Sequence, residues 1–436
     1  MGNYIPNIDE EQKEMLNSLG MSSFDELYKD VPEKLMKNET FSIPDGKSEQ
    51  EVLSFMKKIA EKNKVYDDIF RGAGAYNHFI PAMVNNVISK ENFQTAYTPY
   101  QAEVSQGVLQ NIFEYQTMIC ELTGMEASNA GVYDGASAAA EAVNMIRTKK
   151  KNKILVSETS PKSTIDVIKT YAFGNGVEVE IVPQKDYLTD IEKLKGMLEK
   201  DVCGIFLQSP NYYGSIENVE EIANLVHEAG GKVILGVNPM TLGLLKTPRE
   251  LGADIATGDA QPLGLPMYFG GPYAGFMATT SKDLRKLPGR IVGETHDKYG
   301  NRAFVLTLQA REQHIRREKA SSNICSNEAL CCLAVAVYLS EVGKKGLKKV
   351  AINSMSNAHY LASELEKIGF NVENKSEFFH EFVTSSDKDT KLIDKKLSDN
   401  SILGGLPLDE NRILWCCTEM NSKEDIDKLI SVLKED

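Results

Sequence analysis

The feature of this chain that most limits its fold is a regular alternation of two kinds of segment, which begins at Lys153. Short apolar runs rich in β-branched residues cover residues 153–157, 177–182, 203–208, 232–237 and 253–258. Amphipathic stretches with helical spacing separate them at 161–173, 190–200 and 218–230. This alternation is typical of βαβ units, in which a helix connects two parallel strands. The sequence therefore predicts an α/β fold with a doubly wound, mostly parallel sheet.

The segments on either side of this region differ from it in character. Residues 1–80 are polar and helix-like, which predicts an N-terminal helical arm and not a domain. From Ser322 onward the sequence is mostly helical, and it ends with an apolar run before a last amphipathic stretch. We therefore expect the arm over residues 1–80, a large α/β domain over 81–321 and a small C-terminal α+β domain over 322–436.

The charge balance limits the partners of the chain. Its 436 residues include 62 Asp and Glu against 49 Lys and Arg, which gives a net charge of −13. This charge argues against nucleic acid and anionic membranes as partners, and no apolar run approaches membrane-spanning length. The seven cysteines show neither metal-ligand spacing nor a disulfide pattern. We expect a cytoplasmic protein with reduced thiols and no metal site.

Ligands of open α/β sheets bind beyond the carboxyl ends of the strands, so the loops after residues 237 and 258 are the first candidates for a site. Enzymes that hold pyridoxal phosphate on this architecture need a lysine for the aldimine, a carboxylate for the pyridine nitrogen and a helix N-terminus for the phosphate. Asn238 stands where the carboxylate is expected, and Gln261 lies where the lysine is expected. No lysine occurs between Gly252 and Ser281.

The expected phosphate position departs from the pattern as well. The stretch YDGASAAAEAVNMI reads as a loop that opens a helix, but Asp134 places an anion at the mouth. As a helix cap Asp134 is ordinary, whereas as the neighbour of a phosphate it is repulsive. Lys246 is the nearest lysine, yet it precedes the last predicted strand. The sequence therefore predicts a degenerate cofactor site, altered at Asp134, Asn238 and Gln261.

Two long strings of unusual composition carry a family resemblance: TAYTPYQAEVSQGVLQNIFEYQTMICELTGMEASNA and LPGRIVGETHDKYGNRAFVLTLQAREQHIRREKASSNICSNEAL. They resemble the pyridoxal-phosphate glycine decarboxylase, which is the P protein of the glycine cleavage system. More narrowly, the chain is similar to the α subunit, or subunit 1, found where that enzyme is split into two polypeptides. The resemblance runs nearly end to end and implies the pyridoxal-phosphate-transferase-like fold, fold type I.

The resemblance also implies a function that no spacing in the sequence establishes. In that family the catalytic lysine belongs to the β subunit, or subunit 2, which binds pyridoxal phosphate covalently. Glycine is decarboxylated, and its aminomethyl group passes to the lipoyl arm of the H protein, whose disulfide is reduced. The family suggests an assembly of two α and two β chains. The missing lysine is then expected, and no catalytic residue is expected in this chain by itself.

Three segments are candidates to line a cleft or an interface. The stretch YTPYQAE is dense in polar and aromatic residues, which favours a cleft or an interface; the alternative is that it anchors the arm to the domain. Asn77 and His78 follow two glycines, although a lone histidine is more often structural. In REQHIRREKASSN, Arg311 and His314 are expected to share a helical face, which a solvated helix would explain equally. The candidates of the first segment are Tyr97, Thr98, Tyr100, Gln101 and Glu103.

Two other functions stay open at the level of the sequence. A self-contained pyridoxal-phosphate enzyme, such as an aminotransferase, would carry a bound chromophore in the isolated chain. A purely structural scaffold subunit would tolerate substitutions in YTPYQAE without any change in turnover. The adjacent Cys331 and Cys332 lie in an apolar helical stretch, so we expect them in the core.

Overall fold

The computed structural model describes residues 8–36, 42–94, 97–324 and 328–434, and the chain divides between Lys64 and Val65 into two compact units. The first unit contains helices α1 (Asp9–Ser18) and α2 (Glu49–Ala60) and the 3-10 helices η1 (Phe24–Tyr28) and η2 (Glu33–Leu35). Ser48 and Glu51 form a capping box that fixes the start of α2. All described strands belong to the second unit.

A seven-stranded sheet forms the centre of the second unit, in the order β2-β10-β9-β8-β7-β3-β4. Five strands run parallel: β3 (Lys153–Ser157), β4 (Glu178–Val182), β7 (Val202–Gln208), β8 (Lys232–Gly236) and β9 (Ile255–Asp259). The strand β10 (Gly275–Thr279) is antiparallel to β9 and to β2 (Ala127–Ser128). The predicted α/β class and mostly parallel sheet are confirmed. The five predicted strands match the five parallel ones, whereas β10 was not predicted.

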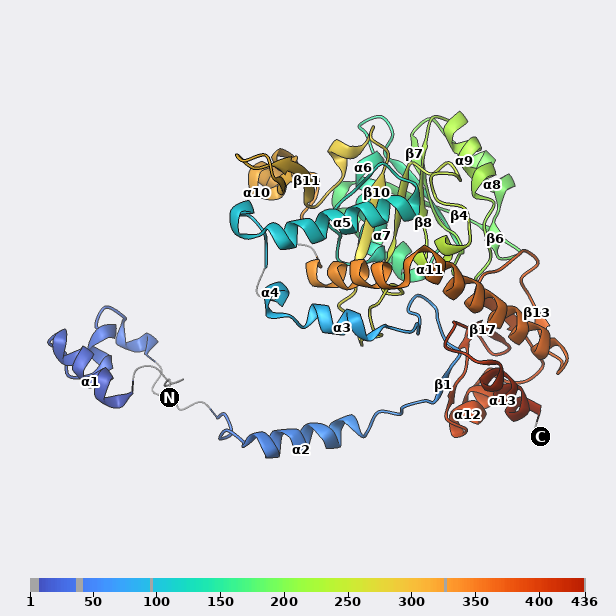
Figure 1. Cartoon of the computed structure of the whole chain (residues 1–436). Helices are drawn as coiled ribbons and strands as arrows, with labels where there is room; N and C mark the ends of the chain where they lie inside the picture. The colour runs from blue at the N-terminus through green and yellow to red at the C-terminus, as the bar shows by residue number, and fades with distance from the viewer. Residues whose placement is uncertain (1–7, 37–41, 95–96, 325–327, 435–436) are drawn as a thin grey trace. The chain divides into compact units, whose positions relative to one another are not determined.

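Successive residues of a strand point to opposite sides of the sheet, so these mostly apolar strands present apolar side chains on both faces. Helices cover both faces. Ile154 and Ile234 pack beneath α6 (Gly135–Ile146) and α7 (Lys162–Asn175). Leu155 and Leu235 face the opposite layer, which consists of α5 (Gln106–Thr123), α8 (Ile191–Met197), α9 (Val219–Glu228) and the first half of α11 (Ala329–Glu366). Figure 1 shows α5 and α11 crossing this face of the sheet.

The start of α6 is fixed by its sequence. The Oδ1 atom of Asp134 accepts a hydrogen bond from the Ser137 amide at 2.7 Å, and the alanine-rich stretch that follows favours a helix. Gly135 lies so close to β9 that a Cβ atom there would stand 2.8 Å from the Asp259 nitrogen. Glycine therefore allows the N-terminus of α6 to sit beside the carboxyl end of β9.

The C-terminal part of the second unit contains an antiparallel sheet in the order β13 (Asn371–Val372), β14 (Glu381–Ser385), β17 (Arg412–Cys416), β16 (Leu406–Pro407). The helices α12 (Thr390–Asp399), α13 (Lys423–Lys434) and the second half of α11 pack around Trp415. α11 breaks its helical geometry at Gly343, where φ is 58°. The short strand β1 (Asp68–Ile69) pairs with β15 (Ile402–Leu403). The domain boundaries after residues 80 and 321 stay predictions.

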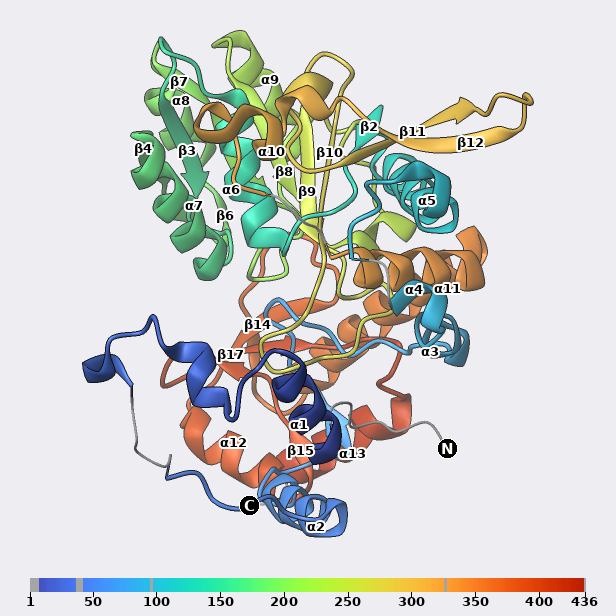
Figure 2. The same cartoon turned by 90° about the vertical axis from the view of Figure 1, so that its left-hand side faces the viewer.

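A hairpin of β11 (Ile291–His296) and β12 (Arg302–Thr307) lies beside α5, and Figure 2 shows it projecting from the sheet. The sequence analysis did not predict it. Its turn is built by Asp297, whose Oδ1 accepts hydrogen bonds from the amides of Tyr299 and Asn301, both at 2.8 Å. Phe304 and Leu306 pack on α5 in a small separate core.

The remaining short elements connect these layers: α3 (Ala82–Ile88), α4 (Glu91–Gln94), η3 (Ala102–Val104), β5 (Gln184–Lys185), β6 (Leu188–Thr189), η4 (Pro239–Gly243), η5 (Leu284–Lys286), η6 (Gln309–Arg311), α10 (Gln313–Arg316) and η7 (Arg317–Lys319). Within the described ranges, no helix combines the length and the apolar character needed to cross a membrane.

Candidate functional site

A cavity of about 270 Å³ opens at the carboxyl ends of β7, β8 and β9, which is where a doubly wound sheet places a ligand site. Its walls come from these strand ends, the start of α6 and residues 73–76. Asp134 and Asn238 line the cavity, and Gln261 adjoins it through Tyr76. None of the described residues that line it is a lysine or an arginine. The three altered positions predicted from the sequence therefore lie together.

Carboxylates of this chain occupy the N-terminus of α6. The Oδ2 atom of Asp259 accepts a hydrogen bond from the Gly135 amide at 3.1 Å, and Asp134 accepts one from Ser137. Burial raises the pKa of Asp259 to about 6; hydrogen bonds from Gln261 and Gly135 oppose this rise, and the charge of Asp134 adds to it. A phosphate dianion at this helix end would meet two carboxylates and find the first amide already bonded.

Gln261 acts as a link between β9 and the segment over the cavity. Its Oε1 accepts from the Tyr76 amide at 2.8 Å, while its Nε2 donates to the carbonyl oxygens of Tyr76 at 3.0 Å and Leu265 at 2.9 Å. The side chain is only 1% exposed. Because all its strong bonds go to backbone groups, Gln261 holds the chain around Tyr76 in place.

Asn238 follows β8 and caps the short helix η4. Its Oδ1 accepts from the Met240 amide at 3.0 Å, whereas its buried Nδ2 has no hydrogen-bond partner among the described residues. A neutral amide cannot form an ion pair with a protonated pyridine nitrogen. The cavity therefore has no lining lysine for an aldimine, and the residue after β8 is no anionic partner for the pyridine nitrogen, so its residues do not fit covalently bound pyridoxal phosphate.

A buried carboxylate that the sequence analysis missed stands behind the cavity. The Oε1 of Glu381 accepts from the Ala73 amide at 2.6 Å, and its Oε2 accepts from the Tyr76 hydroxyl at 2.8 Å. Burial raises the pKa of Glu381 to about 7, against the effect of these two hydrogen bonds. Glu381 begins β14, so it ties the C-terminal sheet to the segment that covers the cavity. No motif in the sequence marks it.

The predicted pair Asn77 and His78 lies just beyond this segment. His78 is buried, and its Nδ1 lies 2.7 Å from the Oε2 of Glu419. The carbonyl of Asn77 accepts a hydrogen bond from the Thr418 hydroxyl at 2.7 Å. Neither residue lines the cavity. These contacts favour the structural alternative for His78 without testing a chemical role.

The structure brings two of the predicted segments together at a second place. Arg290 donates to the Tyr100 hydroxyl at 2.9 Å and stacks over the Tyr100 ring, and the His314 ring lies against the same tyrosine with centroids 6.1 Å apart. The Nδ1 of His314 lies 3.7 Å from the buried Glu312. Burial raises the pKa of Glu312, and the positive charges of Arg290, Arg311 and His314 oppose this rise. None of these residues lines the cavity.

The prediction that Arg311 and His314 share a helical face is wrong. Arg311 ends η6 and His314 belongs to α10, and the extended residue Glu312 separates the two short helices (φ −79°, ψ 157°). Arg311 turns inward instead and donates to the carbonyls of Leu287 and Gly289. The sequence pattern was misleading because these two tertiary hydrogen bonds interrupt a stretch of good helical spacing.

The rest of the YTPYQAE stretch faces solvent for the most part. Tyr97 is 82% exposed and Tyr100 is 56% exposed. The carbonyl of Thr98 accepts from the Tyr100 amide at 2.9 Å, and Gln101 and Glu103 are exposed. Such exposure of two tyrosines leaves this loop available to a partner. Elsewhere in the described residues, no group of three His, Cys, Asp or Glu side chains is arranged to hold a metal ion.

Comparison with known proteins decides the family. Residues 2–433 match the family model of the glycine cleavage system P-protein. The chain belongs to this family. Curated relatives cover nearly its whole length: a probable glycine dehydrogenase (decarboxylating) subunit 1 of Desulfitobacterium hafniense is 46% identical over 443 residues, and one of Carboxydothermus hydrogenoformans is 47% identical over 442. Each alignment covers 99% of this chain and 99% of the relative.

Solved structures agree with the P-protein family. A crystal structure of glycine decarboxylase (P-protein) of the glycine cleavage system, in inhibitor-bound form, is 38% identical with a TM-score of 0.93 and covers 99% of both chains. An alanine–glyoxylate aminotransferase from Nostoc is 17% identical with a TM-score of 0.59, over 92% of this chain and 98% of that chain. The second likeness shows the fold alone. The predicted pyridoxal-phosphate-transferase-like fold is confirmed.

Proposed function

We propose that this chain is the α subunit of a glycine decarboxylase that is split into two polypeptides, and that it works only with a second, lysine-bearing subunit. The observation that carries the proposal is the cavity beyond β9. Asp259 there holds the first amide of α6, Gln261 stands where an aldimine lysine is expected, and no described lining residue is basic. A P-protein chain with such a cavity needs its cofactor supplied elsewhere in the complex.

In the proposed complex, pyridoxal phosphate is bound covalently by subunit 2 and not by this chain. When bound, the cofactor supplies an electron sink for the decarboxylation of glycine. The aminomethyl group passes to the lipoylated H protein, so that protein is the second partner. An assembly of two α and two β chains follows from the family resemblance, and a cytoplasmic location follows from the reduced thiols that the sequence indicates. No step of the reaction runs through the cavity of this chain.

The loop around Tyr100 is the part of this chain that we propose as a wall of the partner's site or as a subunit interface. Tyr100, which is exposed, lies beside Arg290 and His314, so hydroxyl, guanidinium and imidazole groups stand in one place. The purely structural alternative remains: the same groups could bury themselves against the second subunit without approaching the cofactor. Both versions keep the chain obligatory for the complex.

A self-contained pyridoxal-phosphate enzyme is the rival proposal. Against it stand the carboxylates of Asp134 and Asp259 at the start of α6, and the neutral amide of Asn238 after β8. Lys246, the nearest lysine in sequence, is paired with Glu220 at 2.7 Å and does not line the cavity. The carboxylates oppose the phosphate of the cofactor, the amide of Asn238 gives its pyridine nitrogen no ion pair, and the position of Lys246 leaves no amine for the aldimine.

The test is reconstitution. This chain, the second subunit and their mixture are each assayed for glycine-dependent exchange of labelled CO₂ with lipoylated H protein at saturation. We expect exchange only from the mixture, together with a complex larger than either chain by light scattering. Exchange by this chain alone would refute the proposal, and so would full exchange by the second subunit without it.

A further inference from the structure

Six cationic side chains surround a pocket of about 300 Å³, although the chain as a whole is acidic. They come from the end of α6 and from the short helices η5, η6, α10 and η7: Arg147, Arg285, Lys286, Arg311, Arg316 and Lys319. Among the described residues that line this basic pocket, Glu141 is the one carboxylate. Six like charges around one hollow repel each other, so the arrangement favours an anion between them.

The internal partners of these cations leave most of the charge uncompensated. Lys286 pairs with Asp283 at 3.3 Å. Arg311 and Arg316 donate to backbone carbonyls, and Arg147 donates to Asn175, which are neutral groups, although Arg311 also interacts with the charge of Glu312. Within the described part of the chain, Arg285 and Lys319 form no ion pair. Arg147 also follows the C-terminus of α6, where a cation is ordinary. The helix end does not explain the other five.

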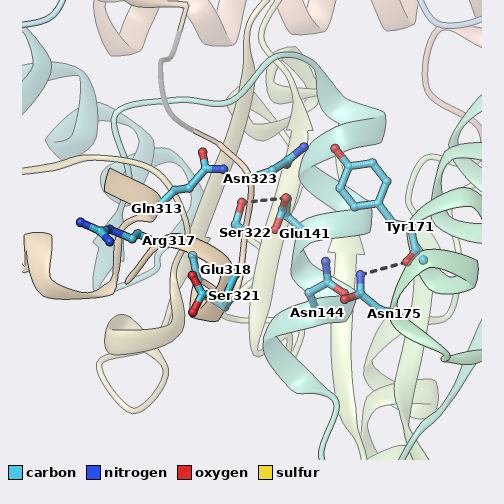
Figure 3. A pocket seen from close by; sticks show the side chains of 12 residues that line it. Glu141, Asn144, Tyr171, Asn175, Gln313, Arg317, Glu318, Ser321, Ser322 and Asn323 are labelled. Carbon is cyan, nitrogen blue, oxygen red and sulfur yellow. Dashed lines mark hydrogen bonds between the residues drawn. The ribbon is translucent and has the colours of Figure 1, made fainter. Parts of the chain in front are cut away.

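A second hollow of about 420 Å³ adjoins the basic pocket, and the two share Glu141, Asn144 and Ser321. Figure 3 shows its lining: Gln313 and Asn323 lie on one side, Asn144, Tyr171 and Asn175 lie on the other, and Ser322 donates to Glu141 between them at 2.8 Å. Arg317 and Glu318, which carry opposite charges, also line it. Amide groups can donate to and accept from the edge of a heterocycle, and the ring of a tyrosine can stack on its face. This amide hollow therefore differs in chemistry from the basic pocket beside it.

We propose that the two hollows together bind a nucleoside polyphosphate, with the phosphates in the basic pocket and the base in the amide hollow beside Tyr171. Guanidinium groups bind phosphate oxygens through paired, charge-assisted hydrogen bonds, which suits the four arginines of the basic pocket. Glu141 at the junction can accept a hydrogen bond from a ribose hydroxyl. The site shares no lining residue with the cavity at the carboxyl ends of β7, β8 and β9. The proposal does not depend on the proposed decarboxylase function.

The experiment is calorimetric titration of the purified full chain with ADP, tripolyphosphate and adenosine at physiological ionic strength. We expect saturable binding of ADP, with tripolyphosphate at least about tenfold weaker because it leaves the amide hollow empty. Raising the salt concentration should weaken both, since the phosphate contacts are ionic. Absence of saturable ADP binding overturns the proposal, and equal affinity for ADP and tripolyphosphate overturns the assignment of the amide hollow.

Two variants locate the site. Arg285→Glu with Lys319→Glu changes two exposed pocket residues and should lower ADP affinity more than about tenfold. Lys200→Glu with Lys391→Glu makes the same change of charge at exposed positions outside both hollows and should leave it unchanged. Gln313→Ala with Asn323→Ala should weaken ADP and not tripolyphosphate. Equal ADP binding by both charge variants refutes the proposal. The proposal is also refuted if the wild-type chain does not bind ADP and the Arg285→Glu, Lys319→Glu variant does not assemble with subunit 2. That result would make the pocket a docking surface for subunit 2.

Discussion

Replacing Gln261 with leucine should loosen residues 72–79, the segment beside the cavity at the carboxyl ends of β7, β8 and β9. The two side chains are similar in volume, so the change removes hydrogen bonds without opening a large void. Three backbone groups lose their partner: the amide and carbonyl of Tyr76 and the carbonyl of Leu265. All three lie in a region where Gln261 is 1% exposed, so water cannot readily replace it.

The expected cost follows from these contacts. Each buried group left without a partner costs about 1–3 kcal/mol, which gives roughly 5 kcal/mol for three. The extra apolar surface of leucine returns about 1–2 kcal/mol. We therefore expect a net loss of about 3 kcal/mol, borne mainly by local opening of residues 72–79. A loss of that size corresponds to roughly a hundredfold faster amide exchange in this segment if the opening is local.

The assay is hydrogen–deuterium exchange by mass spectrometry on peptides that span residues 70–80, together with urea unfolding followed by circular dichroism. Gln110→Leu is the matched control, because Gln110 is exposed on α5 and bonds only to Glu114 at 2.8 Å. The control should stay within about 0.5 kcal/mol of wild type. Unchanged exchange and an unchanged unfolding midpoint in Gln261→Leu would refute the reasoning that Gln261 holds this segment.

Two further predictions concern the cavity, and a third concerns the loop around Tyr100. Asp259 has a pKa raised to about 6, so the stability that it contributes is present below the pKa of the unfolded state, near 4, and is lost as the pH rises through 6. Asp259→Asn should flatten this pH dependence of the unfolding midpoint, and an unchanged pH profile would contradict the prediction. The double variant Asn238→Asp with Gln261→Lys should show no glycine turnover without subunit 2, because Asp134 still opposes phosphate; measurable turnover would show that the site has changed less than we infer. Tyr100→Phe removes the hydroxyl that Arg290 contacts. The complex should stay intact by light scattering, while the barrier to CO₂ exchange rises by about 1–2 kcal/mol and the rate falls roughly tenfold. A wild-type rate would mean that the loop has only a scaffold role.

The parallel sheet was predictable because its signal is local. The runs at 153–157 and 203–208 are apolar at most positions, since both faces of these strands are covered by helices. The hairpin of β11 and β12 was not predicted, because only one of its faces packs on α5 and half of β11 is exposed, so neither strand is a continuous apolar run. Its turn depends on Asp297, whose side chain bonds to the backbone, and on Gly300, which has a φ of 83°, so the turn carried a local signal that the sequence analysis did not use.

Asn238 and Gln261 could be located from the sequence because they follow strands that the sequence marks, and Asp134 because it opens an alanine-rich helix. Their partners could not, since Tyr76 and Glu381 are distant in the chain from Asn238 and Gln261. The same limit applies to Asp259, because only the fold places its carboxylate on the amide of Gly135. Contacts between residues so far apart depend on the packing of the layers.

The central claim is that this chain is a P-protein subunit that does not carry the cofactor covalently. The most direct measurement is reduction of the assembled complex with borohydride in the presence of pyridoxal phosphate, followed by mass mapping of pyridoxyl-lysine peptides in both subunits. The account predicts one modified lysine, in subunit 2, and none in this chain. A pyridoxyl adduct on a lysine of this chain, with exchange activity lost when that lysine is replaced, would contradict it.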